Sequence, residues 1–101
     1  MNITAKTTLT ALFASPCKHS LSPIMHNKSF EKLSLDYVYL AFEVDKNNLK
    51  EAVASIKTLN MRGVNLSMPN KKEVIQYLDN ISESASLSQS VNTIVNDNGV
   101  L

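Results

Sequence analysis

The chain has 101 residues, an ordinary size for one domain, and 44% of them are hydrophobic, so it can bury a core of its own. Ten basic and nine acidic residues give a net charge of +1, with no run of like charge longer than Lys71-Lys72, which argues against nucleic acid as the main partner. With Cys17 as the only cysteine and no apolar run of about 18 residues, we expect a soluble cytoplasmic protein with no disulfide, metal site or membrane segment.

The first part of the chain predicts a strand, a helix and a second strand. Residues 7–15 are rich in Thr, Leu, Ala and Phe and end at a Ser-Pro pair, which favours a buried strand and a turn. Ser22 and Pro23 suit the start of a helix over residues 22–33, because a serine oxygen can cap free amides and proline fits the first helical position. The aromatic and β-branched residues 36–44 predict the second strand.

The clearest helix follows, with Asp45 expected to cap its start. Its apolar residues recur at intervals of three and four, which places them on one face: Leu49, Ala52, Val53, Ile56 and Leu59.

The rest of the chain continues the alternation of strands and helices. Residues 63–68 predict a third strand, residues 69–78 a helix that Pro69 opens, and residues 91–95 a fourth strand. The NDNG turn at residues 96–99 then leads into a return strand. This order predicts an α/β fold: a three-layer domain with a mostly parallel sheet covered by helices on both faces. Small ligands bind such sheets beyond the carboxyl ends of the strands.

Polar side chains gather where this rule places a ligand. Ser20 and Ser22 flank one residue at the start of the first helix, where free amides and the helix dipole favour an anion such as a carboxylate. A capping role for Ser22 and a loop role for Ser20 remain the alternative. His19 and His26 are more often structural, and no cluster of Cys, Asp or Glu supports a metal site.

A second polar group follows the third strand. Asn65 and Ser67 share one strand face, which is unusual in a buried strand. Lys71 and Lys72 then occupy the first helical turn, where cations are disfavoured, and such broken local rules tend to mark function. Lys71 begins the apolar stripe of that helix, so it is the inward lysine; a snorkelling surface lysine is the alternative.

In the fourth strand, Asn92 lies among Val and Ile and offers both a donor and an acceptor to a polyol. An asparagine that bonds neighbouring backbone is the alternative.

Three motifs together resemble the amino-terminal, substrate-binding domain of the shikimate dehydrogenase family, which includes quinate/shikimate dehydrogenases. HSLSP, NLSMPNK and VNT occur in the family's order and spacing, and YLAFEVD, MRG and IVNDNG are also similar to it. The resemblance covers residues 9–101 and implies that residues 1–101 form the substrate-binding domain of an oxidoreductase. The nicotinamide-cofactor domain and a catalytic aspartate would lie outside this chain.

The resemblance further implies reversible reduction of 3-dehydroshikimate to shikimate with NADPH or NADH, in aromatic amino acid (chorismate) biosynthesis. Ser20 and Ser22 would hold the substrate carboxylate, and Lys71 would be the catalytic lysine that also contacts substrate. Ring hydroxyls would bond to Asn65, Ser67 and Asn92. The resemblance assigns no cofactor-binding residue to this chain, and the isolated chain is expected to be inactive.

Several alternatives stay open at this level. A stand-alone shikimate- or quinate-binding module without catalysis is the second function, and the residues do not choose between shikimate and quinate, NAD and NADP, or monomer and homodimer. Gln89 stands where the family usually has glycine, so a positive φ angle there would strain the loop before Asn92.

Overall fold

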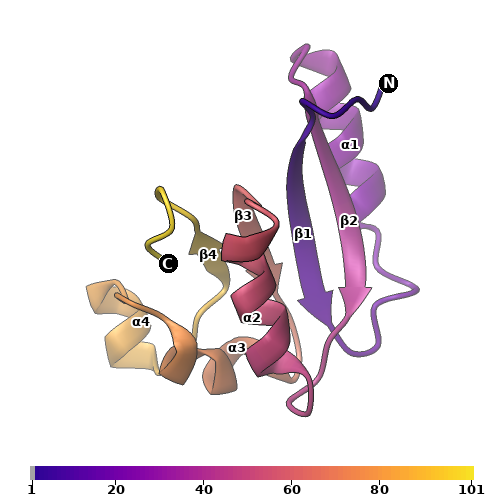
Figure 1. Ribbon diagram of the computed structural model, residues 1–101. Coiled ribbons are helices and arrows are strands. Elements are labelled where there is room, and N and C mark those ends of the chain that lie inside the picture. Colours follow the sequence, from indigo (N-terminus) through magenta and orange to yellow (C-terminus); the bar gives the residue numbers. More distant parts are fainter. Residues whose placement is uncertain (1) are drawn as a thin grey trace.

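The computed structural model describes residues 2–101 (Figure 1). Its strands form one sheet in the order β2-β1-β3-β4, with β1, β2 and β3 parallel and β4 antiparallel to β3. The expected α/β class with a mostly parallel sheet is therefore confirmed. In chain order the elements are β1 (Thr8–Ala14), α1 (Ser22–Lys32), β2 (Tyr37–Glu43), α2 (Leu49–Thr58), β3 (Gly63–Leu66), α3 (Asn70–Glu73), the 3-10 turn η1 (Val74–Tyr77), α4 (Glu83–Ser88) and β4 (Thr93–Val95).

Helices α1 and α2 cover opposite faces of the sheet. Leu12 of β1 packs on the side of α1 with Phe30, whereas Phe13 of β1 packs on the side of α2 with Ile56. The chain moves from β1 outward to β2 and then back past β1 to β3, and right-handed crossovers in opposite directions place their helices on opposite faces. In open α/β sheets such a reversal between β1 and β3 is where a ligand crevice lies, beyond the carboxyl ends of the strands. The carboxyl ends of β1 and β2 point toward the bottom of Figure 1.

The predicted apolar stripe of α2 is confirmed except at its end. Leu49, Val53 and Ile56 are buried, but Leu59 is 59% exposed because the helix ends at Thr58. The cap expected at Asp45 was also wrong. Asn48 is the residue that precedes α2, and the Asp45 carboxylate instead accepts from the Asn47 amide at 2.8 Å, in the turn before the helix.

The single helix predicted over residues 69–78 was wrong, because the segment divides into α3 and η1. In a 3-10 turn, side chains three residues apart eclipse each other, so Val74 aligns with Tyr77. Val74 is part of the α2-side core, and Ile75, Tyr77 and Leu78 pack against that core.

Residues 83–88 form α4, which the sequence pattern did not predict. Its start is capped by the Ser82 hydroxyl, which accepts from the Ala85 amide at 3.1 Å. Gln89 ends the helix with a φ of 55°, so the left-handed conformation expected for a family glycine is present here with a glutamine. The fourth strand is shorter than predicted and begins at Thr93. The return strand is reduced to a single bridge between Asp97 and Val100.

No helix within residues 2–101 combines the length and apolar character that crossing a bilayer requires.

The end of the α2 stripe gives a stability test. Ile56 is fully buried, so Ile56→Ala should lower the free energy of unfolding by about 2–5 kcal/mol through lost burial and a residual cavity. The matched change Leu59→Ala, at the exposed end of the predicted stripe, should stay within about 0.5 kcal/mol of the parent. Urea denaturation of both variants measures the difference, and equal losses would contradict the position of the helix end.

Candidate functional site

The predicted site residues line a single hollow of about 450 Å³ at the carboxyl ends of the strands. We call it the carboxyl-end pocket. Its lining contains every one of the residues to which the sequence assigned a binding or catalytic role. The complete lining is Leu12, Ser20, Ser22, His26, Asn65, Leu66, Ser67, Lys71, Asn92 and Thr93.

The loop from β1 to α1 brings the two serines to the pocket. Ser22 was expected to cap α1, but it is the first helical residue, and Leu21 occupies the capping position without a side-chain bond. The Ser20 hydroxyl accepts from the Ser22 amide at 3.2 Å instead. The half-buried Ser22 hydroxyl is therefore not used as a cap and lines the pocket beside Ser20.

Glu43, at the end of β2, anchors the beginning of this loop. Its carboxylate accepts from the Ser15 hydroxyl and, at 3.1 Å, from the Cys17 amide, and the Cys17 carbonyl in turn accepts from the Ser20 amide at 3.1 Å. The Ser15 bond and then the Cys17 amide hold the pKa of Glu43 below its ordinary value near 4.5. Burial raises the pKa of the Cys17 thiol, and the nearby Glu43 carboxylate raises it further. A charged Glu43 thus stabilises the loop that carries Ser20.

Leu12, Asn65 and Thr93 form the floor of the pocket, because they are aligned across β1, β3 and β4. The Asn65 amide donates to the Thr93 hydroxyl at 3.0 Å, and its oxygen accepts from the Tyr39 hydroxyl at 2.9 Å. Asn65 is thereby held in one orientation by neighbours on both sides.

Tyr39 supports the site through Asn65 without lining the pocket, and sequence reasoning missed it. It is buried on β2, its ring stacks on His26 with centroids 4.3 Å apart, and burial raises its pKa while a hydrogen bond with Ser22 opposes the shift. The neutral hydroxyl is thus available to donate to Asn65. The available signal was the tyrosine itself, since a tyrosine at the centre of a strand usually needs a partner for its hydroxyl when buried.

The two lysines of α3 differ as predicted. Lys71 is half-buried and lines the carboxyl-end pocket, whereas Lys72 is exposed. The Lys71 carbonyl accepts from the Val91 amide at 2.8 Å, and the Asn92 carbonyl accepts from the Leu66 amide at 2.8 Å. These bonds hold the segment before β4 against α3 and β3, which brings Asn92 to the pocket.

The lining has a chemistry suited to an anionic polyol. Lys71 supplies a positive charge, none of the lining residues is acidic, and serine, threonine and asparagine supply donors and acceptors. A ligand with one carboxylate and several hydroxyls matches this set.

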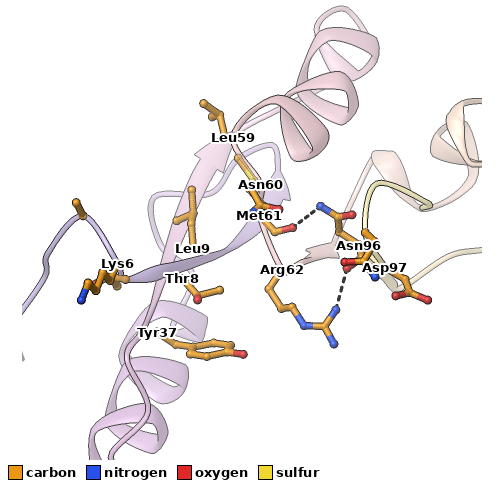
Figure 2. Close-up of a pocket in the computed structure, with 13 residues that line it drawn as sticks. Lys6, Thr8, Leu9, Tyr37, Leu59, Asn60, Met61, Arg62, Asn96 and Asp97 are labelled. Carbon is orange, nitrogen blue, oxygen red and sulfur yellow. Dashed lines mark hydrogen bonds between the residues drawn. The ribbon is translucent and has the colours of Figure 1, made fainter.

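A larger hollow of about 590 Å³ lies beside the amino ends of β1, β2 and β3 (Figure 2). Two of its polar side chains bond within the fold: the Arg62 guanidinium donates to the Asn96 carbonyl at 2.8 Å, and the Asn96 amide donates to the Met61 carbonyl at 2.8 Å. We favour the smaller carboxyl-end pocket as the functional site, because ligands of α/β sheets bind at the carboxyl ends of strands.

Within residues 2–101, no three side chains of His, Cys, Asp or Glu are grouped closely enough to hold a metal ion.

Comparison with known proteins gives a consistent result. Residues 12–94 match the sequence model of the family described as "Shikimate dehydrogenase substrate binding domain". An NADP(+) shikimate dehydrogenase of Listeria monocytogenes is 56% identical over 99 residues, which are 98% of this chain and 34% of that protein. This chain therefore spans about a third of the length of the curated relatives it matches.

Two solved structures share the fold. A shikimate 5-dehydrogenase from Listeria monocytogenes, in complex with shikimate and NAD, superimposes with a TM-score of 0.96 at 54% identity, covering 99% of this chain and 35% of that one. A 5-ketofructose reductase of Gluconobacter sp. superimposes with a TM-score of 0.93 at 32% identity, covering 97% and 35%.

The Glu43 anchor predicts a specific pH dependence. Because the pKa of Glu43 is lowered by folding, its stabilisation is present above its unfolded value near 4.5 and is lost as the pH falls through the folded value. In Glu43→Gln this contribution is removed at every pH. The difference in melting temperature between parent and variant should be largest near pH 7 and shrink below pH 4.5. Thermal unfolding at a series of pH values measures it, and a constant difference would contradict the anchor.

Proposed function

The chain belongs to the family of shikimate dehydrogenase substrate-binding domains, and from this premise we propose that it binds substrate in an enzyme that interconverts 3-dehydroshikimate and shikimate. The observation that carries the proposal is the carboxyl-end pocket, because one hollow gathers the hydroxyls, amides and lysine that such a substrate requires.

Each end of the substrate has a matching group. The carboxylate binds at Ser20 and Ser22, beside the start of α1, where hydroxyls and the helix dipole favour an anion. The ring hydroxyls bond to Asn65, Ser67 and Asn92. The fold alone does not choose a carboxylated ligand, since a 5-ketofructose reductase shares it. The choice of shikimate rests on the serine pair and on 56% identity to a shikimate dehydrogenase.

Lys71 has the position and chemistry of the acid-base group. Its ammonium stabilises the negative charge that develops on the carbonyl oxygen during reduction and delivers a proton to that oxygen. In the reverse direction the neutral amine takes the hydroxyl proton. The nicotinamide cofactor, when bound, supplies or accepts the hydride.

The cofactor binds outside residues 1–101 in this proposal. Gly63 and Gly99 are the only glycines of the chain, so it cannot form the glycine-rich turn that binds dinucleotide phosphates. NADP is the expected cofactor, since the curated relatives are named for it.

Lys71 and Lys72 provide the test, because they share their chemistry and differ in position. In the complete enzyme, Lys71→Met should lower turnover by about two to four powers of ten, since it keeps the aliphatic stem and removes the acid-base group. The affinity for shikimate should change much less. Steady-state kinetics with shikimate and NADP measure both effects.

Lys72→Met is the matched control and should keep turnover within a few-fold of the parent, because an exposed lysine contributes little. A fully active Lys71→Met enzyme would contradict the catalytic assignment. A parent protein that binds shikimate but turns over no substrate would instead support a binding module without catalysis.

A further inference from the structure

Asn70 is a fully buried polar residue at the start of α3, directly before Lys71. Its side-chain amide donates to the Phe13 carbonyl at 3.3 Å and to the Val44 carbonyl at 2.7 Å. Phe13 is near the carboxyl end of β1, and Val44 directly follows β2. One side chain therefore ties the first turn of α3 to the ends of two neighbouring strands.

These two bonds fix the orientation of the amide. If it were turned over, its oxygen would face two carbonyl oxygens and both interactions would become repulsive. In the observed orientation the Asn70 Oδ1 is buried and has no hydrogen-bond partner among the described residues. A buried unpaired acceptor is destabilising. The chain thus keeps an amide that is not fully satisfied at this position, and such local conflicts tend to lie at functional sites.

The backbone of the same turn connects Asn70 to the pocket. The Asn70 amide group of the main chain donates to the Ser67 carbonyl at 2.9 Å, and the Lys71 carbonyl accepts from Val91 at 2.8 Å. The turn held by the Asn70 side chain therefore contacts both Ser67 and the segment that leads to Asn92. Successive residues of a helix point about 100° apart, so the orientation of this turn decides that Lys71 and not Lys72 faces the pocket. A rotation of the turn would therefore redirect Lys71.

We propose that Asn70 is a positioning residue for Lys71: by tying the first turn of α3 to the ends of β1 and β2, it aims the lysine at the carboxyl-end pocket. This role rests on the proposed function, since it requires Lys71 to be the acid-base group. Asn70 lines no part of the pocket and acts through its neighbour.

The chain offers a matched control in Asn96. Asn96 is also buried, and its amide likewise donates to two carbonyls, those of Ile56 and Met61. It lies in the larger hollow beside Arg62 (Figure 2) and lines no part of the carboxyl-end pocket. Asn70→Ala and Asn96→Ala should therefore both lower the melting temperature. Only Asn70→Ala should lower kcat, by about ten- to a hundred-fold, with KM for shikimate within about three-fold of the parent, because small misplacements of a catalytic group are costly.

A double-mutant cycle in the complete enzyme is the decisive experiment, with kcat measured for the parent, Asn70→Ala, Lys71→Met and the double variant. If Asn70 acts through Lys71, then Asn70→Ala should reduce kcat less than about three-fold once Lys71 is methionine. A reduction of equal factor in both backgrounds, or parental kcat in Asn70→Ala, would overturn the positioning role.

The two single variants test the role of Lys71 and the role of Asn70 separately. Parental turnover in Lys71→Met rejects the proposed catalytic role of Lys71, whereas an impaired Lys71→Met with a fully active Asn70→Ala rejects only the role of Asn70. Should Asn70→Ala not accumulate as folded enzyme, Asn70→Ser replaces it in the cycle, because its hydroxyl can still donate to one of the two carbonyls. Because serine keeps one bond, its loss of kcat should be smaller than that of alanine. A kcat equal to that of the parent, or a loss of equal factor in both Lys71 backgrounds, would still overturn the positioning role.

Discussion

The reversal of chain direction around β1 determines where this domain can bind a ligand. Because β2 and β3 lie on either side of β1 and are reached by crossovers that run in opposite directions, α1 and α2 cover opposite faces and a crevice opens between the ends of β1 and β3. The loop that carries Ser20 and the turn that carries Lys71 both begin at this edge. The strand order therefore sets the location of the carboxyl-end pocket, and the side chains set its lining.

Polar contacts around the crevice then set its geometry. Glu43 anchors the loop before α1, Tyr39 orients Asn65, and Asn70 ties α3 to the strand ends. At the other end of the sheet, the Arg62 guanidinium bonds to the Asn96 carbonyl after β4, and the Asn96 amide bonds to the Met61 carbonyl before β3. Both edges hold buried or half-buried polar groups, but the carboxyl edge also leaves hydroxyls, amides and an ammonium lining an open hollow.

The sequence predicted the features that depend on neighbours along the chain. The periodicity of Leu49, Val53 and Ile56 identified α2, and the step between Lys71 and Lys72 on a helix identified the inward lysine. Features that depend on distant partners were missed. The anchoring role of Asn70 requires Phe13 and Val44, which lie 57 and 26 residues away. Helix α4 was missed for another reason, because it is short, polar and without apolar periodicity.

A crystal structure of the complete enzyme with bound shikimate tests the central claim most directly. We expect the ligand in the carboxyl-end pocket, with its carboxylate within hydrogen-bond distance of the Ser20 and Ser22 hydroxyls and a ring hydroxyl next to the Lys71 ammonium. Shikimate bound instead in the larger hollow beside Arg62, with the carboxyl-end pocket empty, would contradict the assignment of the site.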